Sequence, residues 1–427
     1  MRLSSTLARG LVELPAPPGP VGMYVCGPTV YARAHIGNAR PYVVGSWYAR
    51  WLRVRGYEVT LVHNITDVND KIYEAAPGAS AERAREATEW YLEDVARFGL
   101  DEVDHFPKAT ETMPEIVRFI SDLIERDFAY EVDGDVYFRV ARQADYGRLS
   151  GQRPDQVEEQ EPNARKEDPR DFALWKANKP EEDTWWDSPW GRGRPGWHIE
   201  CSAMAEKLLG PSFEIHGGGL DLVFPHHENE LAQSSALGQE FARIWMHNGM
   251  LRFTGEKMAK SVGNVATIQE VLEEWGRETT LLFFLTAHWH SPIDFSAERM
   301  ESAASQAETF RNAFRGDVPG GAAWAEWEHF ASKLDEDFNT PQALAVLHEW
   351  RAAGVLDLLR RGLDVFGLSS LADSHVAPAD VEQLARRRQE ARAARDFAES
   401  DRLRGEIEKA GWEVRDEADA YRLVPKA

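Results

Sequence analysis

Residues 23–63 read MYVCGPTVYARAHIGNARPYVVGSWYARWLRVRGYEVTLVH, and this stretch decides the fold. Met23–Cys26 is typical of a short buried strand, and Tyr57–His63 is a second, β-rich strand. A Gly27–Pro28 break and a helix-like run over about 38–55 lie between them. A strand, a helix and a strand at this spacing predict a right-handed βαβ unit in a parallel sheet.

The rest of the chain predicts an interrupted α/β core followed by helices. Helical patterns cover 81–98 and 113–128, and residues 130–146 alternate as strands do. Residues 151–195 are polar and typical of an insertion, after which helix and sheet signals return at 196–249. Beyond residue 267 the pattern is nearly all helical, with amphipathic runs at 267–285, 297–316, 323–335 and 341–364. The predicted fold class is therefore α/β, with a Rossmann-like parallel sheet, an insertion and a mostly α-helical C-terminal region.

Composition sets limits on compartment and partners. The 427 residues carry a formal charge of −22, which argues against nonspecific nucleic-acid binding over the whole surface. Residues 386–404 nevertheless hold seven arginines against four acids, which is compatible with a local basic patch that binds nucleic acid, although a charge run of this kind is more often a solvated helix face. No stretch approaches 18 apolar residues, and no secretory signal opens the chain, so we expect a cytoplasmic protein without a membrane span.

Two short motifs suit a nucleotide triphosphate. His35-Ile-Gly37-Asn38 lies between the first strand and the first helix, where free N–H groups and a partial positive charge favour phosphate. Lys257 and Lys260 stand three apart in a glycine-bounded loop at 255–264, which could close over a triphosphate and stabilise the leaving pyrophosphate. A capped structural turn and an ordinary exposed loop are the alternatives.

A metal site is the hypothesis for the two cysteines, which are too few for a disulfide framework. His226 and Glu230 stack one turn apart on a helix, and imidazole, carboxylate and the Cys201 thiolate are all acceptable donors for Zn²⁺. Cys26 could supply a fourth donor from the end of the first strand. His227 and His198 compete as ligands, and spacing alone leaves structural histidines as an equal alternative.

The glycines of His216-Gly217-Gly218-Gly219-Leu-Asp221 also require an explanation. Close approach of the backbone to a flat ligand such as adenosine is one, and a tight strand-to-helix turn is the other. Asp221 could pair with a ligand amine or a ribose hydroxyl.

Taken together and in order, these elements closely resemble the cysteinyl-tRNA synthetases, a family of class I aminoacyl-tRNA synthetases. The resemblance covers nearly the whole chain. It rests on MYVCGPTVY at 23–31, HIGNAR at 35–40, NITDVNDKI at 64–72, DGDVYF at 133–138, DPRDFALWK at 168–176, RPGWHIECSAMA at 194–205, HGGGLDLVFPHHENELAQS at 216–234, GEKMAKSVGN at 255–264 and DEDFNTPQALAVL at 335–347.

The resemblance implies a role for each matching position. It implies that catalysis rests on His35, Asn38, Lys257 and Lys260. The implied ATP site comprises His35, Gly37, Asn38, Gly217, Gly218, Asp221, His247, Asn248 and Lys260. The substrate cysteine would contact Thr66, Trp197 and Asp221. The implied zinc ligands are Cys26, Cys201, His226 and Glu230, which favours His226 over His227, and the expected tRNA contacts are Arg386, Arg387, Arg388, Arg392 and Arg395.

Domains and partners follow from the same resemblance. We expect one Zn²⁺ per chain, Mg²⁺ with ATP, and a monomer that takes L-cysteine and tRNA(Cys) as substrates. Four protein ligands leave Zn²⁺ crowded when a substrate thiolate joins them, so one ligand is expected to be loosely held. The expected domains are 1–118 and 194–250 for the catalytic core, 119–193 for the connective insertion, 251–310 for the Lys-Met-Ala-Lys-Ser loop and stem-contact region, 311–375 for the helical bundle and 376–427 for the anticodon-binding domain.

Two departures and two rival functions accompany this reading. Ala259 stands where the family usually has Ser, and the bundle at 349–367 is shorter than usual. The first rival is the cysteine ligase of mycothiol biosynthesis, which lacks an anticodon-binding tail. The second is a non-catalytic zinc and RNA-binding paralogue, which would not need both phosphate motifs.

Overall fold

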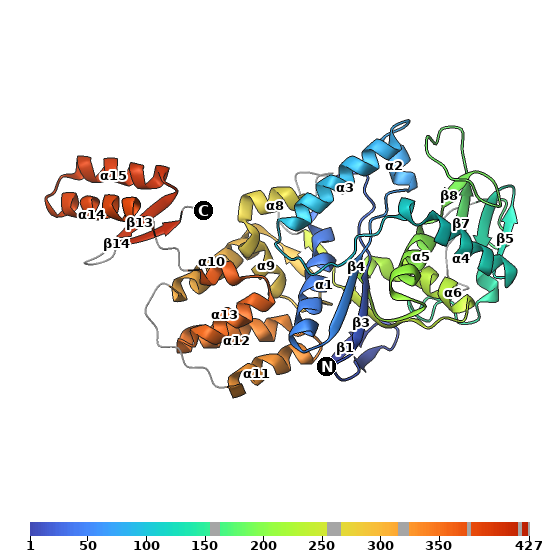
Figure 1. The fold of residues 1–427 in the computed structure, drawn as a ribbon, viewed down its shortest axis with the longest axis horizontal. Coiled ribbons are helices and arrows are strands. Elements are labelled where there is room, and N and C mark those ends of the chain that lie inside the picture. The colour runs from blue at the N-terminus through green and yellow to red at the C-terminus, as the bar shows by residue number, and fades with distance from the viewer. Residues whose placement is uncertain (154–162, 254–265, 315–323, 374–376, 417–420, 426–427) are drawn as a thin grey trace. The chain divides into compact units, whose positions relative to one another are not determined.

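The computed structural model describes the chain except residues 154–162, 254–265, 315–323, 374–376, 417–420 and 426–427 (Figure 1). The chain forms two compact units. The first contains Met1–Ala313 with Val318–Leu371, and the second contains Phe314–Asp317 with Ala372–Ala427.

A four-stranded parallel sheet forms the core of the first unit. Its strand order is β10 (Phe241–Asn248), β9 (Ser212–Gly219), β3 (Pro20–Val25) and β4 (Glu58–His63). Helix α1 (Ile36–Val54) connects β3 to β4, so the predicted strand–helix–strand unit and the Rossmann-like fold class are confirmed. The helix buries large side chains such as Trp47 and Trp51 almost completely, which fixes its position against the rest of the unit.

The polar middle of the chain forms a second sheet. Strands β5 (Ala129–Val132), β6 (Asp135–Phe138), β7 (Phe172–Ala177) and β8 (Gly193–Pro195) pair antiparallel in that order. Helices α2 (Asp70–Ala75), α3 (Ser80–Ala96) and α4 (Met113–Glu125) lead from β4 of the first sheet to β5 of the second. After β8, the chain returns to the first sheet, where α5 (Trp197–Leu209) precedes β9 and α6 (Glu228–Ala236) precedes β10. The first strand pair of the chain is a hairpin of β1 (Arg2–Ser5) and β2 (Gly10–Glu13).

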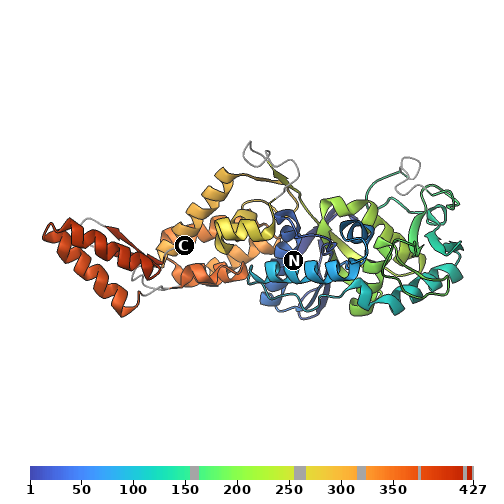
Figure 2. The ribbon, with the colours of Figure 1, turned by 90° about the horizontal axis from the view of Figure 1, so that it is seen from above.

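Two of the long amphipathic runs are each two helices. The run at 267–285 divides into α8 (Ile268–Trp275) and α9 (Arg277–Leu285), because Gly276 has a φ of +76° and ends the first helix. The run at 341–364 divides at Gly354, with a φ of +71°, into α12 (Thr340–Ala353) and α13 (Leu356–Val365). Together with α10 (Ala297–Ala313) and α11 (Trp324–Asp335) they form the helical region of Figure 1 and Figure 2.

A pair of short parallel strands links this helical region to the parallel sheet. Strand β11 (Leu251–Phe253), which follows β10, pairs with β12 (Ile293–Phe295), which lies between α9 and α10. The second unit contains α14 (Ala379–Ala393), α15 (Phe397–Lys409) and an antiparallel pair of β13 (Trp412–Asp416) with β14 (Tyr421–Pro425). Within the described ranges, none of the helices combines the length and the apolar character needed to cross a bilayer.

Candidate active site and metal centre

The turn before α1 is a capped helix N-terminus. The Nδ1 atom of His35 accepts a hydrogen bond from the Gly37 N–H at 3.1 Å, and the Asn38 Oδ1 atom accepts one from the His35 N–H at 3.2 Å. Burial lowers the pKa of His35, and the carboxylate of Asp221 opposes that shift. At neutral pH, His35 therefore presents a neutral imidazole at the positive end of a helix, where a phosphate is favoured.

A cleft of about 300 Å³ opens beside this turn. Seven of the predicted site residues line it together: Cys26, His35, Gly37, Asn38, Trp197, Asp221 and Asn248. They come from the end of β3, the start of α1, the start of α5 and the ends of β9 and β10. The carboxyl ends of the parallel strands thus build the cleft, as expected for ligand sites in open α/β sheets.

The residues that flank the second signature motif border the same cleft. Lys257 and Lys260 lie outside the described residues, but the segments on both sides of the loop are placed. Leu251 and Phe253, which precede the loop, line the cleft. On the other side, the Ala266 carbonyl accepts a hydrogen bond from the Ile36 N–H at 3.0 Å. The described residues on both sides of the motif therefore lie next to the cleft.

Three of the expected ATP contacts lie elsewhere. The side chain of His247 is buried, with Nε2 2.7 Å from Nδ1 of His227 and Nδ1 2.7 Å from the Thr6 hydroxyl. Neither Gly217 nor Gly218 lines the cleft. A Cβ atom on Gly218 would lie 2.9 Å from the His227 ring, so this glycine makes room for a neighbouring histidine. The tight packing against His227 therefore requires a glycine at position 218.

Thr66 also lies behind the cleft. It is 1% exposed and is absent from the residues that line the cleft. Its backbone N–H donates to the Pro28 carbonyl at 3.1 Å, and its hydroxyl lies 3.4 Å from the amide nitrogen of Asn64. Thr66 therefore supports the Cys26–Pro28 turn from behind in this conformation.

The predicted metal ligands form one buried cluster. Cys26, Cys201, His226 and Glu230 each offer a ligand atom, and these atoms all lie within 4.8 Å of one another. The Cys26 and Cys201 sulfurs are 3.9 Å apart, and His226 Nε2 lies 3.0 Å from Glu230 Oε1. The other ring nitrogen of His226 lies 3.0 Å from Nδ1 of His198, and the Trp197 ring stacks on it with centroids 4.1 Å apart. Such contacts orient a ligand imidazole.

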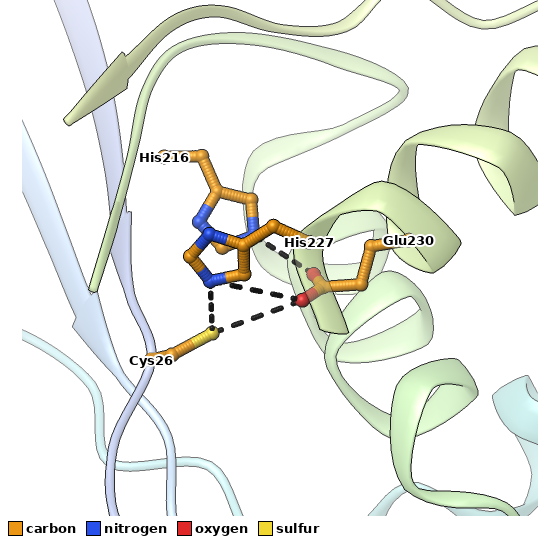
Figure 3. Close-up of side chains that lie close together, drawn as sticks. All are labelled: Cys26, His216, His227 and Glu230. Carbon is orange, nitrogen blue, oxygen red and sulfur yellow. Dashed lines mark hydrogen bonds and ion pairs between the residues drawn. The ribbon is translucent and has the colours of Figure 1, made fainter. Parts of the chain in front are cut away.

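A second set of side chains overlaps the first. Cys26 and Glu230 also lie close to His216 and His227, and these four again place ligand atoms within 4.8 Å (Figure 3). His216 Nε2 is 2.8 Å from Glu230 Oε2, and His227 Nε2 is 3.3 Å from the Cys26 sulfur. The first set contains two thiols and is therefore the better donor set for Zn²⁺. His216 was not predicted to lie in the cluster, because it precedes a glycine run and has no ligand spacing.

Burial controls the charge of the cluster. It raises the pKa of the Cys26 thiol well above its ordinary value, and the neighbouring Cys201 and Glu230 raise it further. Burial also raises the pKa of Cys201 and Glu230 and lowers that of His226 well below its ordinary value. Two thiols and a carboxyl without a cation are costly to ionise here, whereas a bound dication would favour their ionised forms. The donor chemistry and the burial therefore both fit a metal ion.

Two further residues of the cleft were missed from the sequence. Lys71, at the start of α2, lines the cleft with its ammonium 5.6 Å from the centre of the Tyr31 ring. Arg40 also lines the cleft, although it is 1% exposed, and its guanidinium donates to the carbonyl oxygens of Gly249, His288 and Ser291. Lys71 stood inside a quoted motif, but no spacing rule assigns a role to a single cation.

The arginines of the second unit differ in exposure. Arg388 is 3% exposed and forms two hydrogen bonds to the carboxylate of Asp416, at 2.6 and 3.0 Å, and Arg392 pairs with the same carboxylate. Arg387 lies 3.3 Å from Glu399, and Arg386 lies 3.6 Å from Glu382. Arg395 occupies the turn between α14 and α15 with a φ of +61°. Arg388 therefore joins α14 to β13 within the unit.

Comparison with known proteins identifies the family. Residues 13–305 match the catalytic domain of class I (C) tRNA synthetases, and residues 329–353 match the DALR domain. Residues 375–421 match the anticodon-binding domain of cysteinyl-tRNA ligase. The cysteine–tRNA ligase of Methylobacillus flagellatus is 45% identical over 96% of both chains, and that of Anoxybacillus flavithermus is 43% identical over 92% of both. The chain belongs to the cysteine–tRNA ligase family.

The family carries the class I fold, and solved structures agree with it. The Mycobacterium tuberculosis methionyl-tRNA synthetase bound by methionyl-adenylate superimposes with a TM-score of 0.57 at 16% identity, covering 84% of this chain and 86% of that one. The Agrobacterium radiobacter LeuRS, solved as a ternary complex, reaches a TM-score of 0.58 at 11% identity, covering 85% and 86%. These two likenesses support the fold, and the family membership supplies the class: the chain is an aminoacyl-tRNA synthetase of class I.

Proposed function

We propose that this chain activates L-cysteine with ATP and transfers it to tRNA(Cys), and that it recognises the substrate's sulfur through Zn²⁺. Family membership supports the overall reaction. The observation that carries the metal-based recognition is the buried cluster of Cys26, Cys201, His226 and Glu230, which meets the cleft at Cys26.

Cysteine and serine differ by one atom, and a pocket that only fits shape separates such pairs by about 1–3 kcal/mol. Zn²⁺ held by the four cluster residues would supply a soft Lewis acid that prefers a thiolate to a neutral hydroxyl. Glu230 is the ligand we expect to be loosely held, because its Oε2 atom already has an alternative partner in His216. A protein that distinguishes cysteine from serine through Zn²⁺ needs no separate editing domain.

Activation would place ATP along the cleft with its phosphates at the start of α1. The cysteine carboxylate attacks the α-phosphorus, cysteinyl-adenylate forms, and pyrophosphate leaves, with Mg²⁺ accompanying the phosphates. His35 and Asn38 would face the phosphates from the first turn of α1, and Lys257 and Lys260 would close over them from the signature loop. No protein nucleophile is required.

The amino acid would lie between the metal cluster and the nucleotide. Trp197 lines the cleft and stacks on His226, so it adjoins both sites. We assign Asp221 to the substrate's ammonium group, because Asp221 lines the same cleft and its negative charge opposes the lowering of the His35 pKa by burial, as a group that favours a nearby cation does. Thr66 would act from behind, through the turn that carries Cys26. Asn248, with the backbone of Gly249, is proposed to contact adenine.

Transfer needs the terminal ribose hydroxyl of the tRNA, which attacks the carbonyl carbon of cysteinyl-adenylate and releases AMP. The second unit is proposed to bind the tRNA(Cys) anticodon region through Arg386, Arg387, Arg392 and Arg395, with Arg388 holding α14 in place. We further propose that the protein acts as a monomer in the cytoplasm.

Two rival functions are less well supported. A cysteine ligase of mycothiol biosynthesis would not need the anticodon-binding domain that residues 375–421 match. A non-catalytic paralogue would not need a cleft in which His35, Asn38 and Asp221 come together.

Two assays on the intact protein test the proposal. Cysteine-dependent exchange of pyrophosphate into ATP measures activation, and charging of tRNA(Cys) measures transfer. Exchange without charging would refute the synthetase function and favour the amino-sugar ligase. Cys201→Ser should lose zinc and exchange together, whereas exchange at the wild-type rate in this variant would refute the role of zinc. His227→Gln serves as the comparison, because it removes a histidine from the second set and should keep the metal if the first set binds it.

A further inference from the structure

Two histidines and an aspartate outside the active site meet in a second cluster. His288 and His290 lie in the loop after α9, and Asp337 lies in the turn between α11 and α12. The Nε2 atoms of His288 and His290 are 3.7 and 3.6 Å from the same oxygen, Oδ2 of Asp337. The two imidazole rings lie with their centroids 4.1 Å apart. None of these residues belongs to the buried cluster around Cys26.

The carboxylate of this cluster is held in place by its neighbours. The Ser4 N–H donates to Asp337 Oδ1, and the Ser4 hydroxyl donates to Oδ2, both at 2.7 Å. The Asp337 backbone has a φ of +59°, and it is fixed by hydrogen bonds to Arg2 and from the Trp289 indole. A non-glycine residue in the left-handed region costs energy, so the surrounding contacts specify this conformation.

The spacing of the donor atoms is close to that of a metal site with three protein ligands, since all three lie within 4.8 Å of one another. Donor atoms bound to one tetrahedral Zn²⁺ at about 2.0–2.1 Å lie about 3.3 Å from one another. The two nitrogen-to-oxygen distances of 3.6 and 3.7 Å exceed that spacing by only a few tenths of an ångström. Imidazole and carboxylate suit zinc, nickel, cobalt and copper ions.

Access and charge set the character of the site. The His290 side chain is 46% exposed, so an ion can enter from solvent, whereas those of His288 and Asp337 are 15% and 16% exposed. The Arg40 guanidinium, which donates to the His288 carbonyl, adds a positive charge nearby and weakens the attraction for a cation. The expected ion is therefore exchangeable and not permanently bound.

We propose that His288, His290 and Asp337 bind a divalent transition-metal ion at a second site, distinct from the active-site cluster. The ion would join three segments that are distant in the sequence: the β1 strand through Ser4, the loop after α9, and the α11–α12 turn. Water would complete its coordination on the exposed side.

Metal binding to the zinc-loaded full-length protein tests this proposal. Equilibrium dialysis against Ni²⁺, followed by measurement of both nickel and zinc in the protein, separates uptake at a new site from exchange at the old one. The wild type should take up one equivalent of nickel without losing zinc. The His290→Arg variant should lose that equivalent, because an arginine can still donate a hydrogen bond to Asp337 but cannot ligate a metal.

Two further variants make the result specific. His329→Ala removes an exposed histidine outside the cluster and should bind nickel as the wild type does. Cys201→Ser should lose zinc yet keep the nickel equivalent. The proposal would be overturned if His290→Arg took up as much nickel as the wild type does. It would also be overturned if the wild type took up nickel only by losing zinc, or took up none. An effect of His329→Ala as large as that of His290→Arg would also overturn it, since binding would then be nonspecific.

Discussion

Arg40 is expected to hold the nucleotide side of the cleft. Its guanidinium is buried, faces no carboxylate among its hydrogen-bond partners, and donates to the backbone carbonyls of Gly249, Ser291 and His288, the last two at 2.8 and 3.0 Å. Burial lowers the pKa of Arg40 to about 10, so keeping this charge inside costs free energy that only its hydrogen bonds offset. These hydrogen bonds fix the backbone at Gly249, His288 and Ser291 relative to α1.

The perturbation is Arg40→Met, which keeps the bulk and removes the donors. A hydrogen bond from a charged donor contributes about 1.5–3 kcal/mol, and a buried carbonyl left unpaired costs about 1–3 kcal/mol. Three such bonds are lost, but the cost of burying the charge is relieved as well. We therefore expect the free energy of unfolding to fall by about 2–4 kcal/mol, within the range for breaking a buried polar network.

The same change should weaken ATP binding, because Gly249 lines the cleft. A loss of about 1.4 kcal/mol in the preorganisation of this segment raises the KM for ATP about tenfold. Urea unfolding measures the stability, and pyrophosphate exchange measures the KM for ATP and for cysteine.

The matched control is Arg53→Met on the same helix. Arg53 hydrogen-bonds to the Glu102 and Val59 carbonyls and to Asp104, and it does not line the cleft. This variant should lose stability and keep its KM for ATP. An unchanged KM for ATP in Arg40→Met, or an equal rise in Arg53→Met, would refute the reasoning.

Three other outcomes are expected. Removal of zinc by dialysis against a strong chelator should abolish cysteine-dependent pyrophosphate exchange while ATP still binds, and added Zn²⁺ should restore the exchange. Metal analysis and ATP-binding calorimetry check this. Cysteine-dependent exchange by the metal-free protein would contradict it. His63 is buried against the Tyr91 hydroxyl, and burial lowers its pKa from 6.5 to about 4. Because the unfolded chain then binds a proton that the folded chain does not, stability should fall by about 2 kcal/mol between about pH 7 and pH 5 at about 1.36 kcal/mol per unit. His63→Gln should lose less over that range in urea unfolding, and an identical pH dependence would exclude His63 as the cause. Finally, Arg387→Ala should lower tRNA affinity and reduce the salt slope of binding by about 1, whereas Arg388→Met should loosen the second unit and make it cleave faster under limited proteolysis. A wild-type cleavage rate in Arg388→Met would contradict the structural role of Arg388.

Local sequence patterns were sufficient for the architecture. The strand–helix–strand order of residues 23–63 appears as β3, α1 and β4, and α1 begins within two residues of the expected start. The helical runs were found, but Gly276 and Gly354 were not recognised as helix ends. A glycine inside an amphipathic run is tolerated in some helices and ends others, and only the packing of the two helices decides which.

The features of the candidate site likewise fall into those that are local in the sequence and those that depend on tertiary contacts. The helical spacing of His226 and Glu230 and the position of Cys26 at a strand end are local features, and they were readable from the chain. The second set, in which His216 and His227 lie close to Cys26 and Glu230, could not be predicted from the sequence. The approach of these residues depends on how β9 lies between β3 and β10. The burial of Arg388 against Asp416 and the position of His247 behind the cleft are also long-range contacts.

The sequence by itself thus determined the order of strands and helices and the residue types at the ends of the strands, because these depend on periodicity and on neighbours within a turn. The tertiary structure decided which of the histidines adjoin the thiols, which glycines make room for side chains, and which arginines stay exposed. Those outcomes depend on the adjacency of strand ends in the parallel sheet and on helix packing, which bring together residues about two hundred positions apart in the chain, such as Cys26 and His227.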